Sequence, residues 1–431
     1  MTDSFPNEPA PFITFYSFKG GVGRSMALVN VAGIVAGRGF RVLAIDLDLE
    51  APGISYLMGK ERAEGEESPP GFVDLILQGV KQPKQSDLFR AEPAELVERY
   101  TQPYAIPEEL RHSDEGFLRI MPAGRFDGGY GQRLNELALG KLYADGYGWR
   151  VIQAFKKKVQ DSRAFDYVFV DSRTGFSEEA GICTRDLADY LVIVTGLNHQ
   201  NTEGTARFLQ ALKASDPELK DFRVVLSPMP MGEDDLADRR EAEIQRRLSD
   251  AWGEEVSVTL RIPYHPRLAL TEEPYVFKRG RGDLYEAYIE LEESVRAMLG
   301  ADRDNEAIRD ANYFGNLASQ HFTRGLLDRG IEKLRDALEA NPDEAALNCE
   351  LCFYAYAHAW TEWPGALAKL KRLLKKGERT KGWKLKENVR VAREQGHPEP
   401  EFVEALAKVV SDEESIETLE QFPAWRDTEP Q

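Results

Sequence analysis

The sequence is poor in cysteine, has no long apolar run and carries no basic excess. Its three cysteines among 431 residues are too few for a disulfide framework and are typical of a reducing compartment. No apolar run approaches the ~20 residues of a membrane-spanning helix, and the first residues lack the layout of a signal peptide. A net charge of −18 opposes broad binding to nucleic acid or to an anionic membrane. We therefore expect a cytoplasmic protein without membrane contact.

What the sequence does contain is the composition of an ordinary globular protein, 42% hydrophobic and 30% charged. At ~100–200 residues per domain, the chain is long enough for two or three domains. Strand and helix patterns alternate over residues 11–300, which predicts a doubly wound, mostly parallel α/β sheet. Residues 1–10 form a polar leader, and the segments 59–116 and 126–147 are insertions whose role the sequence leaves open.

The most informative stretch lies near the N-terminus and reads F-Y-S-F-K-G-G-V-G-R-S, from Phe15 to Ser25. An apolar run, Phe12–Phe15, leads into it, and a helical pattern, Met26–Gly37, follows. Glycine N–H groups can turn toward phosphate oxygens and a helix N-terminus attracts anions, so this order predicts a phosphate-binding loop. Ser25 would then place its hydroxyl on Mg²⁺. A purely structural strand–helix turn is the alternative.

Three aspartates follow buried strands further along the chain. Asp46 and Asp48 come after the apolar run Arg41–Ile45, and Asp171 closes the run Phe165–Val170 in the form of a Walker B element. In open α/β sheets, ligands bind at the carboxyl ends of the strands, so we expect these carboxylates to face the glycine loop. Asp171 is suited to accept hydrogen bonds from waters on Mg²⁺. Taken alone, two acidic residues after a strand are also consistent with a solvated strand end.

The loop departs from the general pattern G-x-x-x-x-G-K-[ST] at Phe18 and Arg24. It resembles the deviant loop K-G-G-x-G-K-[ST] of the ParA/MinD family of dimeric P-loop ATPases, with Lys19 as the family's signature lysine. The stretch from Asp46 to Pro52 is similar to the family's D-x-D…P element. The Arg24-bearing loop and the stretch Asp171-Ser172-Arg173-Thr174-Gly175 together resemble one subgroup of this family. That subgroup is similar to regulators in bacterial signalling or phage defence.

The resemblance implies a dimer that closes around two ATP molecules, with Lys19 reaching the partner's phosphates in trans. It implies that Asp48 orients the attacking water and that Asp46 supports it near the metal. The implied metal-binding residues are Ser25 and Asp171, and the implied catalytic residues are Lys19, Asp48 and Asp171. The implied nucleotide contacts come from Lys19, Gly20, Gly21, Val22, Gly23, Arg24, Ser25, Met26, Asp46, Arg173, Ser227 and Pro263.

Several of these positions depart from the family's pattern. A guanidinium cannot copy the compact lysine ammonium, although Arg24 could hold phosphate oxygens bidentately, so we expect slow turnover. Met26 replaces a common second threonine. Ser227 stands where the family's asparagine reads the base, so ATP versus GTP stays open. Arg173 is either a source of positive charge for the γ-phosphate or an arginine paired with Glu178 or Glu179.

The pattern changes to purely helical from about residue 302. The stretch Asp328–Asp343 resembles the second helix of a tetratricopeptide repeat, and Gly365–Leu370 echoes it near the ~34-residue repeat length. We expect residues 301–410 to form a tetratricopeptide-like domain that holds a protein partner; an irregular helical bundle is the alternative. The basic run 369–390 is a solvated helix face or a local nucleic-acid contact, and residues 411–431 form an acidic tail.

The sequence therefore predicts a Mg-ATP-dependent, dimerising ATPase switch that regulates a protein partner, in bacterial signalling or phage defence. One alternative is a nucleotide-binding scaffold or sensor with little hydrolysis. The other is a partition or positioning ATPase that acts on DNA or cargo, which the acidic net charge disfavours.

Overall fold

The computed structural model divides the chain into two compact units, Met1–Ala301 and Asp302–Gln431. In the first unit it describes residues 9–57, 68–113, 115–144, 147–215, 219, 221–230, 232, 234–271, 273–278 and 282–299. In the second it describes residues 334–335, 338, 348, 351–352, 368–373, 405–406 and 408, all of them helical. The predicted repeats, most of the basic run 369–390 and the acidic tail lie outside the described residues and stay predictions.

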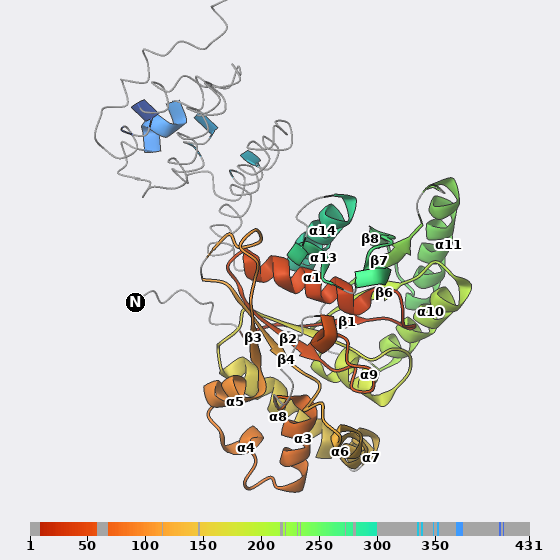
Figure 1. Ribbon diagram of the computed structural model, residues 1–431. Helices are drawn as coiled ribbons and strands as arrows, with labels where there is room; N and C mark the ends of the chain where they lie inside the picture. The colour runs from red at the N-terminus through yellow and green to blue at the C-terminus, as the bar shows by residue number, and fades with distance from the viewer. Residues whose placement is uncertain are drawn as a thin grey trace, which may run out of the picture. The chain divides into compact units, whose positions relative to one another are not determined.

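The first unit is built on one eight-stranded sheet (Figure 1). Its strand order is β3-β4-β2-β5-β1-β6-β7-β8, and all neighbours are parallel except β3 and β4. The strands are β1 (Phe12–Tyr16), β2 (Arg41–Asp46), β3 (Gln102–Tyr104), β4 (Phe117–Met121), β5 (Tyr167–Asp171), β6 (Tyr190–Thr195), β7 (Asp221–Met229) and β8 (Val258–Pro263). The predicted mostly parallel α/β sheet is thus confirmed.

Helices connect the strands and cover both faces of the sheet. They are α1 (Arg24–Gly37), α2 (Ile54–Leu57), α3 (Phe72–Lys81), α4 (Asp87–Arg90), α5 (Pro93–Tyr100), α6 (Tyr130–Leu137), α7 (Leu139–Ala144), α8 (Tyr147–Asp161), α9 (Glu178–Gly181), the π-helix η1 (Ile182–Leu187), α10 (His199–Ala214), α11 (Asp234–Trp252), α12 (Leu268–Thr271), α13 (Tyr275–Lys278) and α14 (Asp283–Met298).

Strand β1 shows why both faces need cover, because all five of its residues are buried. Successive side chains of a strand point to opposite faces, so its apolar residues require packing on both sides. Phe12 belongs to a core with α3, α5 and α8, and Tyr16 to a core with α10 and α11. The opposite face is covered by α1, α13 and α14 (Figure 1). The central strand therefore delivers the loop that follows it from a fixed position.

Helix α1 is tied to the last helices of the unit along its length. A Cβ on Gly33 would lie 2.4 Å from the Phe277 ring, so only glycine permits this approach of α13. The backbone N–H of Val276 donates to Asn30 Oδ1 at 2.8 Å. Beyond the C-terminus of α1, Arg38 Nη2 lies 2.7 Å from Glu292 Oε2, with both side chains fully buried. These contacts fix the axis of the helix whose N-terminus follows the glycine loop.

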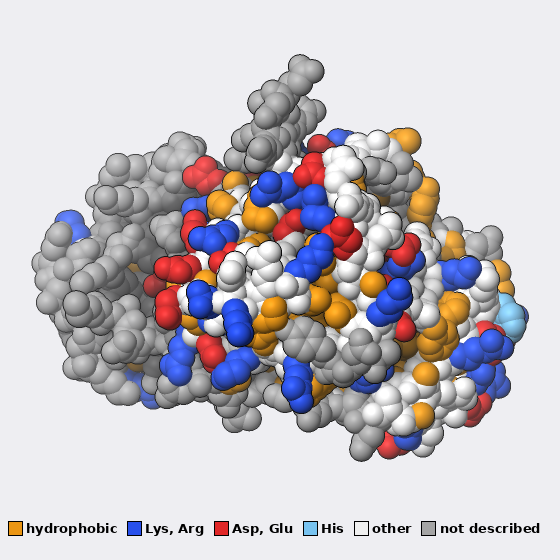
Figure 2. Space-filling model, turned by 90° about the horizontal axis from the view of Figure 1, so that it is seen from below, with side chains coloured by type: hydrophobic (Ala, Val, Ile, Leu, Met, Phe, Trp, Pro, Cys, Tyr) orange, Lys and Arg blue, Asp and Glu red, His pale blue; other side chains and the backbone are white. Residues whose placement is uncertain are grey.

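The helical layer that includes α3 to α7 forms the lower side of the first unit in Figure 1, and Figure 2 views it from below. Basic and acidic side chains are interspersed over this face. Several are ion-paired: Lys81 contacts Glu136, and Arg99 lies 2.8 Å from Asp87. Part of the charge on this layer is therefore matched locally. No helix in the described part of the chain is long and apolar enough to cross a membrane.

Candidate nucleotide site

The glycine loop leaves β1 at Tyr16 and enters α1 at Arg24. Gly21 and Gly23 have φ of 79° and 82°, in the left-handed region that favours glycine, and Gly23 is the N-cap of α1. A Cβ on Gly20 or Gly21 would meet no atom of the described residues within 4 Å, so this stretch of backbone faces open space. A loop of this shape, at a helix N-terminus, has the geometry of an anion cradle.

Arg24 points across the sheet edge to the predicted carboxylates. Its Nε donates to Asp171 Oδ1 at 2.6 Å, and its Nη2 donates to Asp48 Oδ2 at 2.9 Å. The same Nη2 lies 3.3 Å from Ser25 Oγ. The structure therefore brings together Ser25, Asp48 and Asp171, as the sequence predicts, and places the Arg24 guanidinium among them.

The Arg24–Asp171 ion pair is almost completely removed from solvent, with side-chain exposures of 6% and 0%. Burial alone would lower the pKa of Arg24, but the Asp171 and Asp48 carboxylates more than offset it, so its pKa is raised. Burial raises the pKa of the Asp171 carboxyl, and the charge of Arg24 opposes that shift. The charge of each partner thus makes the largest contribution to offsetting the cost of burying the charge of the other.

Two observations indicate that Ser25 and Asp171 could bind a magnesium ion. Asp171 Oδ2 is buried and accepts no hydrogen bond within the described part of the chain. A Cβ on Gly53 would lie 3.1 Å from Ser25 Oγ and 3.7 Å from Asp171 Oδ2, so only a residue without a side chain leaves this space open. Among the described residues, no group of three or more His, Cys, Asp or Glu could hold a metal. Ser25 and Asp171 would therefore share the ion with bound phosphates.

Asp46 lies beside Asp171, its register partner on the neighbouring strand, and is completely buried. Burial, and then the charge of Asp171, raise the pKa of Asp46 well above its ordinary range. Its oxygens accept backbone N–H groups of Asp48 at 3.3 Å and Ile54 at 3.0 Å. Asp46 therefore shapes the turn that carries Asp48. Its predicted contact with the nucleotide stays a prediction.

The remaining loop residues differ in exposure. Lys19 is half-buried and pairs with no carboxylate among the described residues, so its ammonium is available for another anion. Val22 is 5% exposed and packs near Gly196, while Met26 is half-buried in the first turn of α1. Val22 thus helps to seat the loop beside the end of β6.

Arg173 follows Asp171 and pairs with a residue that sequence reasoning did not name. Its Nη2 lies 2.5 Å from Glu50 Oε2 and its Nη1 contacts Glu50 Oε1, whereas Glu179 is 3.9 Å away. A hydrogen bond from Arg173 lowers the pKa of Glu50. The pair joins the loops after β2 and β5. The sequence offered no signal for it, because the two residues are 123 positions apart.

The predicted base-side residues lie further along the same sheet edge. Ser227 is buried on β7, and its Oγ would lie 3.3 Å from a Cβ on Gly23, which places it directly beside the glycine loop. Pro263 ends β8 and is half-buried. Their contacts with a base stay predictions.

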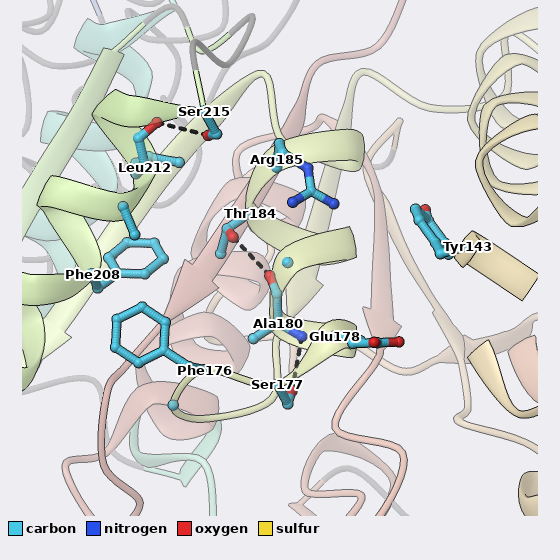
Figure 3. A pocket seen from close by; sticks show the side chains of 13 residues that line it. Tyr143, Phe176, Ser177, Glu178, Ala180, Thr184, Arg185, Phe208, Leu212 and Ser215 are labelled. Carbon is cyan, nitrogen blue, oxygen red and sulfur yellow. Dashed lines mark hydrogen bonds between the residues drawn. The ribbon is translucent and has the colours of Figure 1, made fainter. Parts of the chain in front are cut away.

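A pocket of about 400 Å³ lies between the stretch from Gly175 to Thr184 and helix α10 (Figure 3). Phe176 and Phe208 form an apolar wall, and Ser177 Oγ accepts a hydrogen bond from Ala180 N at 3.1 Å to start α9. Phe176 also packs edge-on against Phe18, at a ring separation of 5.8 Å. The ring of Phe18 fits here because Gly204 has no Cβ, which would lie 1.9 Å from it. The non-glycine Phe18 thus anchors the glycine loop to α10.

A mostly parallel sheet with a glycine loop after the central strand β1, and carboxylates at the ends of its neighbour β5 and of the next strand β2, defines a P-loop nucleotide-binding protein. The family described as the CobQ/CobB/MinD/ParA nucleotide binding domain matches residues 13–345. The chain belongs to this family. No curated protein matches it. The predicted relation to the ParA/MinD ATPases is thereby confirmed, whereas the finer subgroup stays a prediction.

Solved structures that are similar to this chain include two MinD proteins and one McdA protein. The cell division ATPase MinD of Pyrococcus furiosus is 18% identical, with a TM-score of 0.46, over 67% of this chain and 99% of that one. The Cyanothece McdA–ATP complex is 17% identical, with a TM-score of 0.48, over 69% and 98%. The septum site-determining protein MinD of Pyrococcus horikoshii, complexed with Mg-ADP, is 19% identical, with a TM-score of 0.47, over 68% and 99%.

Proposed function

We propose that this chain is a Mg-ATP-dependent switch that closes as a homodimer on its nucleotide face. The observation that carries the proposal is the meeting of an open glycine loop with Ser25, Asp48 and Asp171 at one sheet edge. Those residue types supply a phosphate cradle, a metal hydroxyl ligand and two carboxylates for water, which phosphoryl transfer to water requires.

In this proposal, the N–H groups of residues 19–25 hold the phosphates, and Ser25 and Asp171 hold Mg²⁺. When bound, Mg²⁺ neutralises charge on the β- and γ-oxygens. Asp48 orients the attacking water. Lys19, whose ammonium pairs with no carboxylate in the described part of the chain, reaches the phosphates of the partner copy. Hydrolysis therefore requires two copies of the chain.

A second candidate is a nucleotide-binding sensor with little hydrolysis. It is favoured by the contact of 2.9 Å between Arg24 and Asp48, because an aspartate held by a guanidinium is a weaker acceptor for a water proton. Both candidates bind nucleotide and both need the same loop. They differ in turnover.

The output of the switch is a protein partner held by residues 301–410, proposed as a tetratricopeptide-like domain, in bacterial signalling or phage defence in the cytoplasm. The net charge of −18 and the locally matched charges of the lower helical layer favour a protein partner over DNA. Contact with nucleic acid would be confined to the basic run 369–390.

The test is to measure ATP and GTP binding, light scattering and hydrolysis at increasing protein concentration. We expect dimers with ATP and turnover that rises faster than linearly with concentration. Lys19→Ala and Asp48→Ala should abolish that turnover, whereas Lys84→Ala, at an exposed position beyond α3, should leave it unchanged. Binding without turnover in the unmodified protein would select the sensor. Failure to bind any nucleotide would contradict both candidates.

A further inference from the structure

Arg24 contacts both residues that are proposed to hold the metal, Ser25 and Asp171, and also Asp48, which is proposed to orient the water. Its Nη2 lies 3.3 Å from Ser25 Oγ and 2.9 Å from Asp48 Oδ2, and its Nε lies 2.6 Å from Asp171 Oδ1. All three contacts come from the two nitrogens on one edge of the guanidinium. The positive charge of the side chain therefore lies directly beside the proposed metal site, against Ser25 Oγ and the Asp171 carboxylate.

The contact with Ser25 conflicts most directly with a metal. A hydroxyl oxygen that coordinates Mg²⁺ must direct a lone pair at the ion, at ~2.0–2.1 Å in near-octahedral geometry. In the structure, an N–H of Arg24 points at the same oxygen. Although the hydroxyl oxygen has two lone pairs, an octahedral Mg²⁺ with its other ligands would have to lie beside a guanidinium that already contacts the same oxygen. Charge and space therefore oppose binding of the metal by Ser25 while Arg24 keeps this contact.

Electrostatics leads to the same result. Arg24 is 6% exposed and Asp171 is fully buried, so screening by water is weak and like charges repel strongly at short range. A guanidinium and a divalent ion within one small cluster would place three positive charges beside Asp48 and Asp171, and the two cations would repel each other. Arg24 therefore opposes capture of the metal while it keeps its contacts with these carboxylates.

A lysine at this position could not hold the cluster in the same way. The guanidinium binds Asp171 and Asp48 through two separate nitrogens, whereas an ammonium is a single point charge on a flexible stem. The replacement of lysine by arginine at position 24 thus creates a contact that a lysine cannot reproduce with the same geometry.

We infer that the Arg24 guanidinium, held by Asp48, competes with Mg²⁺ for Ser25 and Asp171, so that Arg24 must turn away before the metal is captured. This inference rests on the proposed function, and it adds a regulatory step to it. Nucleotide binding by the glycine loop and metal capture become separable events. Any partner that moves Arg24 would increase the affinity for Mg²⁺.

The experiment measures binding of a fluorescent ATP analogue to the full-length protein, with EDTA and then over a Mg²⁺ titration. Direct binding of Mn²⁺ is followed in parallel by electron paramagnetic resonance. Thermodynamic coupling between two ligands is typically ~5–150-fold, and we expect Arg24→Lys to raise the effect of Mg²⁺ on affinity by about tenfold over the unmodified protein. Arg90→Lys, at an exposed position of α4, is the matched control and should have no effect.

Asp48→Asn provides a second variant of unchanged size that removes one carboxylate from Arg24. It should also increase the response to Mg²⁺, although by less than Arg24→Lys, because Arg24 keeps its contact with Asp171. Equal Mg²⁺ responses in all folded variants, with nucleotide still bound, would overturn the competition while leaving the proposed function intact. No nucleotide binding in any variant, with or without Mg²⁺, would overturn both.

Discussion

Two arginines follow the strands of the nucleotide edge, and their surroundings are opposite. Arg24 is buried and joins two carboxylates below the loop, whereas Arg173 is 26% exposed and pairs with Glu50 on the surface. A buried ion pair does not by itself make a protein more stable. Removal of one partner is nevertheless strongly destabilising, because the other charge stays buried without compensation. A surface pair loses little, because water replaces the partner. The same residue type thus acts as a structural requirement in one region and as an adjustable contact in the other.

The largest effect should come from removing the buried guanidinium. Arg24→Ala leaves the buried Asp171 carboxylate without the guanidinium that binds it at 2.6 Å, so the free energy of unfolding should fall by about 3–5 kcal/mol. Urea unfolding followed by circular dichroism measures the change. Arg90→Ala on α4 is the control, and a loss no greater than that of the control would show that the cluster tolerates the uncompensated charge.

An intermediate effect is expected at Gly53, which tests the space beside the buried cluster. Gly53→Ala adds a Cβ methyl group 3.1 Å from Ser25 Oγ. The substitution leaves in place the carboxylates that Arg24 binds. Changes in the outer shell of metal sites typically cost about 10–100-fold in metal affinity, and we expect the lower end of that range for Mn²⁺. Gly128→Ala, where a Cβ meets no described atom within 4 Å, is the matched control. Unchanged Mn²⁺ affinity would place the metal elsewhere.

The smallest effect should come from the exposed arginine. Arg173→Ala should change the free energy of unfolding by no more than about 1 kcal/mol, and the change should shrink at high salt. Because the pKa of Glu50 is lowered by Arg173, the contribution of the pair is present above the ordinary glutamate range and fades as the pH falls through the lowered value. Thermal melts at two salt concentrations and at neutral and acidic pH measure this. A loss as large as that of Arg24→Ala would remove the distinction between the two arginines.

The sequence predicted the elements whose signal is local. The buried strands β1, β2, β5 and β6 are short apolar runs, and the glycine loop is a contiguous pattern, so their place in an α/β sheet could be inferred. Helix α11 (Asp234–Trp252) was not predicted, since charged residues dominate its sequence and its buried side rests on few apolar residues, Ala237, Ile244, Leu248 and Ala251. The antiparallel edge strand β3 (Gln102–Tyr104) was also missed, because three residues that include a proline carry no strand signal.

The candidate site divides in the same way. Its residue types could be predicted from spacing and from the family resemblance, and the structure brings Ser25, Asp48 and Asp171 together as expected. The partners of the charged side chains could not be predicted, because Arg24–Asp171 and Arg173–Glu50 join residues that are 147 and 123 positions apart. Sequence also did not show that Asp46 is used to hold backbone N–H groups.

The close approach of Phe277 to Gly33 determines when helix α1 can pack during synthesis of the protein. The helix that presents its N-terminus to the phosphates emerges early from the ribosome, yet Asn30 and Gly33 find their packing partners only when Val276 and Phe277 have been synthesised. Domains generally fold as units during synthesis, so α1 has to wait for about 240 further residues at ~5–20 residues per second. A nascent chain that stops before α13 would carry the complete phosphate-loop sequence but not the packing that holds it in place.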